Sequence, residues 1–309
     1  MDHLITQRLF LRVLSTAVSF ALLGFFIIGC NPTAIPVADR LGSIPSDATK
    51  ITPEMDENPP ISLSDEYDFP IPLPGSVNTA GGEDSLFITP DVRLPAEQQL
   101  GDGVTGIYVS SRNDDGWGEV SRVLLQEPDR LALDGCAFVA GDVIWFCSTR
   151  EGYSGINWFT AESIDGRWQK WEMVNFDPSF QVGELHLSMD GREMFFASNR
   201  AGGSGGLDIW VSESVGGIWQ TPEPVTAVNT AANEGWPALS PDGSQLWFSR
   251  DYGIWRSLKV NDLWQAPEEI IAPLAGEPTI DQAGNVYFVH HFFSGDTMLE
   301  VDIYLAYRK

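Results

Sequence analysis

A repeat built around tryptophan limits what this chain can fold into more than any other feature. Its members lie 51, 51 and 45 residues apart, at Trp117, Trp168, Trp219 and Trp264. Each follows a short run of β-forming residues, and further upstream lie aromatic runs, two of which follow a tight Asp-Gly turn. Each unit therefore predicts four antiparallel strands, and one four-stranded sheet cannot bury both of its faces alone.

Sheets of this kind become buried when they stack around a common axis as the blades of a propeller. The number of blades follows from the two ends of the repeat. Residues 69–83 echo residues 220–234 but have no blade before them, and the last unit stops after its third strand, at Tyr304. We therefore expect an all-β, five-bladed β-propeller whose N-terminal strand completes the C-terminal blade and leaves no open sheet edge. We expect the four repeated Trp side chains to pack between blades.

Two units carry a more specific motif. One reads Leu187-Ser188-Met189-Asp190-Gly191 and then Phe195-Phe196-Ala197-Ser198-Asn199-Arg200; the other reads Leu239-Ser240-Pro241-Asp242-Gly243 and then Leu246-Trp247-Phe248-Ser249. They resemble the bacterial WD40-like propeller repeat with a Pro-Asp-Gly turn, which occurs in the propeller of the periplasmic Tol translocation protein and in many surface proteins. The resemblance covers roughly residues 66–309. It implies a fold and an exported setting without implying one activity.

The first unit departs from this motif. Its Pro90-Asp91 is followed by Val92-Arg93-Leu94, with neither the glycine nor the aromatic strand of the other units. We therefore expect the second strand of the first blade to be displaced or missing.

The first 29 residues have the pattern of a secretory signal, with Arg8 and Arg12 ahead of an apolar run over residues 13–28. The end of the run resembles a lipobox, which implies that cleavage leaves Cys30 as a lipidated N-terminus. The alternative is a single-span anchor, for which the run is slightly short. Residues 30–65 are rich in Pro, Ser, Asp and Glu, which is typical of a flexible linker.

This divides the chain into a lipoprotein signal peptide (1–29), a lipidated Cys with its linker (30–65) and the propeller (66–309). We expect the protein outside the cytoplasm, on the cell membrane or the outer membrane, held by a lipid such as palmitate. The net charge of −25 argues against nucleic acid and anionic membrane surfaces as partners, because like charges repel. It is compatible with cations, metal ions or neutral sugars, and equally with carboxylates that only keep the protein soluble.

Carboxylates recur where each innermost strand begins. Counted back from the turn glycine, Asp134, Glu184 and Glu277 fall at the same place, and Glu234 falls two residues earlier on the same strand face. The full set is Glu83, Asp84, Asp134, Glu184, Glu234 and Glu277. Because innermost strands line the central channel, we expect these groups to ring one mouth of it, where they could bind Ca²⁺ or a polar ligand. The alternative is that they cap strands and hold water.

The first three of these blades also suggest an enzyme. Five-bladed glycosidases of the arabinanase and invertase type place an Asp, an Asp and a Glu on their first three blades, and the pattern here is similar. The resemblance implies that Asp84 acts as base, Asp134 as orienter and Glu184 as acid. The sequence around these residues matches that family less well than the residue types do.

Three arginines follow the aromatic strands one blade apart, at Arg150, Arg200 and Arg250, with His290 and His291 at the related place in the fifth blade. One interpretation is an ion pair with a carboxylate of the neighbouring blade. The other is a hydrogen-bonding rim for a sugar, with Trp236 or Tyr153 as a stacking surface.

Two cysteines lie on adjacent predicted strands. The turn between Cys136 and Cys147 centres on Gly141-Asp142, so the two face each other, and an exported protein permits a disulfide there. Two buried thiols are the alternative.

Taken together, these features predict a membrane-anchored binding module. We expect its channel mouth to take a carbohydrate or cation, or its rim to take a protein partner. The glycosidase is the alternative, and the identity of any bound metal stays open.

Overall fold

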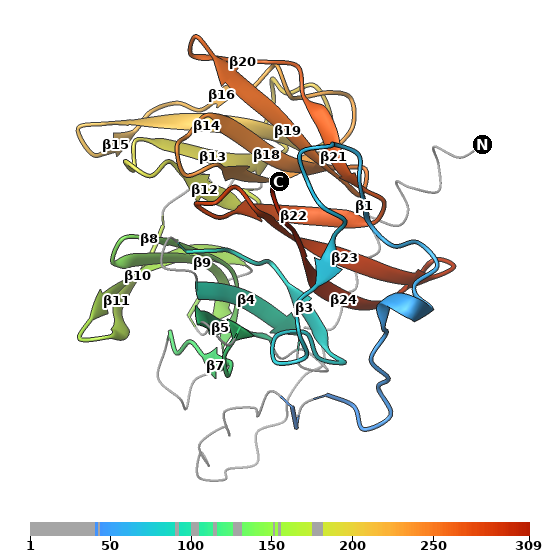
Figure 1. Ribbon diagram of the computed structural model, residues 1–309. Coiled ribbons are helices and arrows are strands. Elements are labelled where there is room, and N and C mark those ends of the chain that lie inside the picture. The colour runs from blue at the N-terminus through green and yellow to red at the C-terminus, as the bar shows by residue number, and fades with distance from the viewer. Residues whose placement is uncertain are drawn as a thin grey trace.

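The computed structural model describes residues 41–42, 44–89, 93–99, 105–113, 116–125, 132–150, 152–153, 156–174 and 182–309. The signal peptide expected over residues 1–29 and Cys30 lie outside these ranges. The described chain forms five antiparallel sheets arranged as the blades of a propeller (Figure 1). Its one helical element is the short 3-10 turn η1 (Pro53–Met55), and no helix in the described ranges has the length and apolar character needed to cross a membrane.

The blades are numbered here in chain order. Blade one has β3 (Gly82–Asp84), β4 (Arg93–Gln99), β5 (Thr105–Asn113), β6 (Gly116–Trp117) and β7 (Ser121–Arg122). Blade two has β8 (Ala132–Ala140), β9 (Val143–Arg150), β10 (Asn157–Ile164) and β11 (Arg167–Met173). Blade three has β12 (Leu185–Leu187), β13 (Glu193–Ser198), β14 (Asp208–Val215), β15 (Ile218–Trp219) and β16 (Glu223–Pro224).

The last two blades also take strands from the N-terminal side of the chain. Blade four has β17 (Glu234–Leu239), β18 (Gln245–Arg250), β19 (Gly253–Val260), β20 (Leu263–Trp264) and β21 (Glu268–Ala272), with β1 (Ile61–Ser62) added beside β21. Blade five has β22 (Ala275–Ile280), β23 (Val286–Ser294) and β24 (Thr297–Ala306), with β2 (Ile71–Pro72) beside β24. The N-terminal segment is therefore bound to two blades.

The predicted Asp-Gly turns are confirmed in blades three and four. Gly191 and Gly243 adopt φ angles of 67° and 69°, a left-handed conformation that favours glycine. The aspartates Asp190 and Asp242 accept hydrogen bonds from Ser188 and Ser240 at 2.7 and 2.6 Å, which fixes each turn. Each turn joins an innermost strand to the buried aromatic strand that follows it.

The hydrophobic core consists of five clusters, and each lies between two neighbouring blades. Two of the repeated Trp side chains show how the clusters are joined. Trp117 of blade one contacts Tyr287 of blade five, and Trp264 of blade four contacts Phe195 of blade three, each edge to face. The prediction that the repeated Trp residues pack between blades is confirmed at these two positions.

Blade one does contain a second strand. β4 pairs with both β3 and β5, so the four-stranded pattern is kept although the Asp-Gly turn and the aromatic strand are absent. The expectation that this strand is missing was wrong, because backbone pairing between strands does not require aromatic side chains.

Candidate ligand site in the propeller channel

Three of the five innermost strands share an irregularity that brings one side chain of each into the channel. β8, β17 and β22 each carry a β-bulge near their start, and the bulged residues Cys136, Trp236 and Glu277 have φ angles between 51° and 55°. Ser85 of blade one has the same conformation, with φ 48°. Together with Glu184, these residues line a cavity of about 50 Å³ on the propeller axis.

A glycine directly precedes the channel residue in four of the five blades. These pairs are Gly135-Cys136, Gly183-Glu184, Gly235-Trp236 and Gly276-Glu277. Carboxylate spacing alone does not reveal this pattern, although glycine inside a strand is a known signal of a bulge. The pattern identifies Cys136 and Trp236 as channel residues alongside the two glutamates.

Two carboxylates line the cavity, Glu184 of blade three and Glu277 of blade five, and Asp84 of blade one contacts Glu277 beside it. Asp84 and Glu277 are hydrogen-bonded to each other, and both also accept the backbone N–H of Ser85, at 2.7 and 2.9 Å. Burial, with the charge of Asp84 nearby, raises the pKa of Glu184 to about 7. The same two causes raise the pKa of Glu277 well above its ordinary value. We call Asp84, Glu184 and Glu277 the channel carboxylates.

The alignment of Asp134 with Glu184 and Glu277 was wrong. Asp134 precedes the bulge of its strand, as Glu234 does, and neither side chain lines the cavity. The reason is the length of the following turn. Val139 pairs with Ile144 in blade two, whereas the equivalent Leu239 pairs with Leu246, so the count from the turn glycine misplaces Asp134 by two residues.

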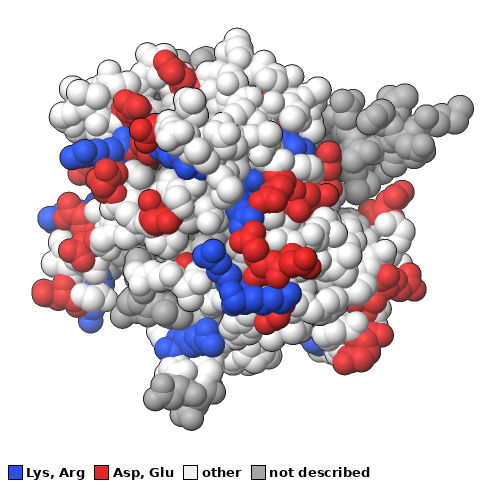
Figure 2. Space-filling view, turned by 45° about the horizontal axis from the view of Figure 1, so that its top comes forward, with Lys and Arg blue, Asp and Glu red and all other residues white. Residues whose placement is uncertain are grey.

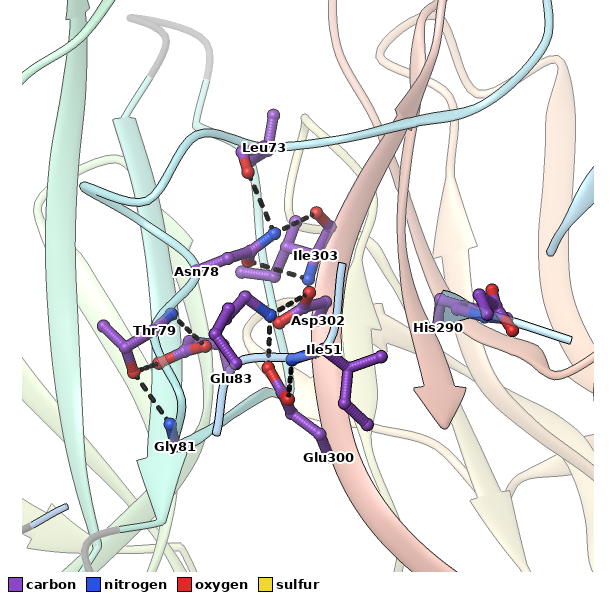
Figure 3. A network of polar contacts seen from close by, with 12 residues as sticks. Ile51, Leu73, Asn78, Thr79, Gly81, Glu83, His290, Glu300, Asp302 and Ile303 are labelled. Atoms are coloured by element: carbon purple, nitrogen blue, oxygen red, sulfur yellow. Dashed lines mark hydrogen bonds and ion pairs between the residues drawn. The ribbon is translucent and has the colours of Figure 1, made fainter. Parts of the chain in front are cut away.

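The carboxylates outside the cavity are buried and held by local partners. Arg150 lies 2.6 Å from Asp134, and Arg250 lies 2.7 Å from Glu234, whose side chain is fully buried. Glu83 accepts hydrogen bonds from the backbone and the hydroxyl of Thr79, as Glu234 does from Thr230 (Figure 3). These contacts give Glu83, Asp134 and Glu234 a structural role.

Arg150 and Arg250 pair with carboxylates of their own blade, which corrects the prediction of an ion pair with the neighbouring blade at these two positions. Asp134 and Glu234 lie on the strand hydrogen-bonded to the strand that carries Arg150 or Arg250, so the partner is already adjacent. Each guanidinium also stacks on aromatic rings of its own blade, and Arg200 does so on Phe196 and Trp210.

The histidines of blade five do not make the contacts that these arginines make. His290 is fully buried and its Nε2 lies 2.9 Å from Asp56 of the N-terminal segment. His291 contacts the backbone of Leu274, and burial lowers its pKa. Neither residue lines the cavity.

One wall of the cavity is apolar. Leu86, Phe87, Phe138, Pro237 and Pro278 contribute to it. His186 lies on this wall with its Nδ1 accepting the N–H of Leu239 at 3.2 Å, and burial lowers its pKa to about 3. His186 is therefore a neutral, hydrogen-bonded side chain at ordinary pH.

Within the described residues, no three His, Cys, Asp or Glu side chains are placed to hold a metal ion together. Figure 2 shows the other acidic residues spread in several groups over one face of the molecule.

No protein-family model and no curated protein matches this sequence. A gluconolactonase from Xanthomonas campestris is 11% identical, with a TM-score of 0.47 over 81% of this chain and 97% of that one. An alpha-L-arabinofuranosidase from Lactobacillus brevis is 11% identical, with a TM-score of 0.48 over 75% and 92%. A protein from Agrobacterium tumefaciens described as a TolB is 19% identical, with a TM-score of 0.39 over 59% and 62%. Enzymes and a protein described as a TolB thus appear together among these likenesses.

Proposed function

We propose that this protein is a membrane-anchored, extracytoplasmic binding module whose channel mouth takes a ligand through a primary ammonium group. The observation that carries the proposal is the contrast between the buried carboxylates that have an arginine and the buried or half-buried channel carboxylates. Asp134 and Glu234 each have an arginine, whereas no described Lys or Arg forms an ion pair with the channel carboxylates. A buried group of like charges is stabilised by a cation that enters from outside.

An ammonium group fits the chemistry of this cavity. It offers three N–H donors, and three carboxylates converge from three blades. The indole of Trp236 lines the same cavity, and its buried Nε1 has no hydrogen-bond partner in the described structure. Aromatic faces favour cations that approach within about 6 Å of the ring.

The size of the cavity supports an ammonium rather than a sugar ring. A volume of about 50 Å³ holds a few water molecules, because one water needs roughly 10–15 Å³ measured in this way. The carbohydrate and the glycosidase alternatives therefore have less support. The latter also needs Asp134, which is held by Arg150 and Ser148 away from the cavity.

We expect n-propylammonium to bind the full-length protein and uncharged n-propanol not to bind, by isothermal titration calorimetry. Glu277→Gln removes one charged acceptor and is expected to weaken binding by roughly ten- to a hundredfold, the equivalent of about 1.5–3 kcal/mol. Because the pKa of Glu184 is about 7, its carboxylate becomes charged as the pH rises through that value, whereas the amine stays protonated. Affinity should therefore rise between pH 6 and pH 8.

The matched control is Glu213→Gln, because Glu213 is an exposed carboxylate on β14. This variant should bind like the wild type. Equal binding of the amine and the alcohol, or an affinity that falls as the pH rises, would overturn the proposal. Release of sugar from aryl-glycosides that is lost in Glu184→Gln would replace it with the glycosidase.

We infer that the lipid anchor is attached at Cys30 and that the N-terminal strand closes the ring. Pairing of β2 with β24, and of β1 with β21, supports the second inference. For the first, a Cys30→Ser variant is expected to move from the membrane fraction to the soluble fraction, as followed by immunoblot. If the variant remained in the membrane fraction after a carbonate wash, a lipid at Cys30 would not be the anchor.

A further inference from the structure

Cys136 and Cys147 lie against each other at the wall of the channel. They belong to adjacent strands of blade two, in which Gly135 pairs with Cys147 and the bulge follows. The left-handed backbone at Cys136, with φ 52°, turns its side chain toward the cavity. Their Sγ atoms are 2.6 Å apart, so no backbone movement is needed for the two sulfurs to bond.

The surroundings of Cys136 supply an acid–base group. Glu184 Oε1 of the neighbouring blade lies 3.9 Å from Cys136 Sγ. The residues that line the cavity include Glu184 and Glu277 and no Lys or Arg. A thiolate beside carboxylates is disfavoured, so the thiol requires a base to take its proton, and Glu184 is in place for that.

We propose that Cys136 and Cys147 are a redox-active pair that exchanges with small cationic disulfides that place one aminoalkyl arm in the cavity, of which cystamine is the simplest. The choice of a cationic substrate rests on the proposed function, because it uses attraction to the channel carboxylates. The pairing of the two sulfurs does not depend on that attraction.

The reaction is a two-step thiol–disulfide exchange. Cys136 gives its proton to the Glu184 carboxylate, and its sulfur attacks one sulfur of cystamine. The S–S bond of cystamine breaks, and a mixed disulfide forms on Cys136. The released aminothiolate takes the proton from Glu184. Cys147 then attacks the Cys136 sulfur, which forms the Cys136–Cys147 disulfide and releases the second aminothiol with the Cys147 proton. The protein dithiol is oxidised by two electrons, and the disulfide is reduced to two thiols.

The test uses the full chain with Cys30→Ser, so that two cysteines remain. The protein is reduced, freed of reductant and mixed with cystamine or with uncharged bis(2-hydroxyethyl) disulfide, and the reaction is followed by mass spectrometry. We expect cystamine to oxidise the pair roughly tenfold faster or more, because a negative cleft concentrates cations. Cys147→Ser should stop at the mixed disulfide on Cys136, and Glu184→Gln should slow the cystamine reaction while Glu213→Gln does not.

The outcomes separate the two proposals. If neither disulfide reacts until the protein is unfolded in urea, while n-propylammonium still binds, the redox pair is wrong and the ligand site stands. If both disulfides react at equal rates and the amine does not bind, the pair stands and the ammonium site is wrong. Near-ultraviolet circular dichroism of each variant shows whether the fold is retained.

Discussion

Arg250→Met is expected to lower the free energy of unfolding by about 3–5 kcal/mol, because it leaves the fully buried Glu234 without its cation. Arg250 Nε lies 2.7 Å from Glu234, and the guanidinium also donates to the carbonyl of Val228 and stacks on Trp255. Methionine keeps much of the side-chain volume, so the loss comes from the uncompensated carboxylate more than from packing. Urea denaturation followed by tryptophan fluorescence measures the change.

Two further variants test the cause. Arg192→Met removes an arginine whose side chain is 80% exposed and should change stability by less than about 0.5 kcal/mol. Adding Glu234→Gln to Arg250→Met removes the unpaired buried charge and should restore a large part of the lost free energy of unfolding. A double variant as unstable as the single one would show that the ion pair is not what Arg250 contributes.

Asn78→Ala is expected to cost about 2–4 kcal/mol and to loosen the join between blades five and one. The buried Asn78 amide bridges two segments. Its Nδ2 donates to the carbonyls of Leu73 and Ile303, and its Oδ1 accepts the N–H of Ile303 (Figure 3). Alanine takes away the acceptor of the Ile303 N–H and the Asn78 donor to both carbonyls, whereas the Ile303 carbonyl keeps the N–H of Leu73. Hydrogen exchange measured by mass spectrometry should show faster exchange at β2 and at Ile303, in addition to the lower stability.

Blade three provides an internal comparison. Asn229 makes the same paired contact with the backbone of Ile209, at 2.9 Å in both directions, but it joins no strand from the N-terminal side. Asn229→Ala should therefore lower stability while leaving exchange at β2 unchanged. Faster exchange at β2 in both variants would mean that Asn78 has no special part in holding that strand.

The fold was predictable because the same sequence signals recur in unit after unit. Strands, Asp-Gly turns and Trp residues recur at one period, and each copy predicts the same four-stranded unit. The similarity of residues 69–83 to residues 220–234 has the same origin. Asn78, Thr79 and Glu83 form one polar network, and Asn229, Thr230 and Glu234 form the equivalent network between blades three and four.

The site was less predictable because position within a strand depends on turns and bulges. The turn after β8 is two residues shorter than the turn after β17, so Asp134 lies outside the channel-lining residues. Left-handed backbone instead places Cys136 and Trp236 among them. The contacts of the N-terminal segment had no local signal at all. Lys50 pairs with Glu300 and Asp302, about 250 residues away, from a stretch whose composition is typical of a linker.

The attachment of the N-terminal segment to two blades determines how the molecule responds to a mechanical load. A pull on the chain before residue 50 meets the ion pairs of Lys50 first, then the contact of Asp56 with His290, and then β1 on the edge of blade four. Only after these have yielded does tension reach β2. Because Glu300, Asp302 and His290 all belong to blade five, the load enters the ring at that blade from the first contact onward.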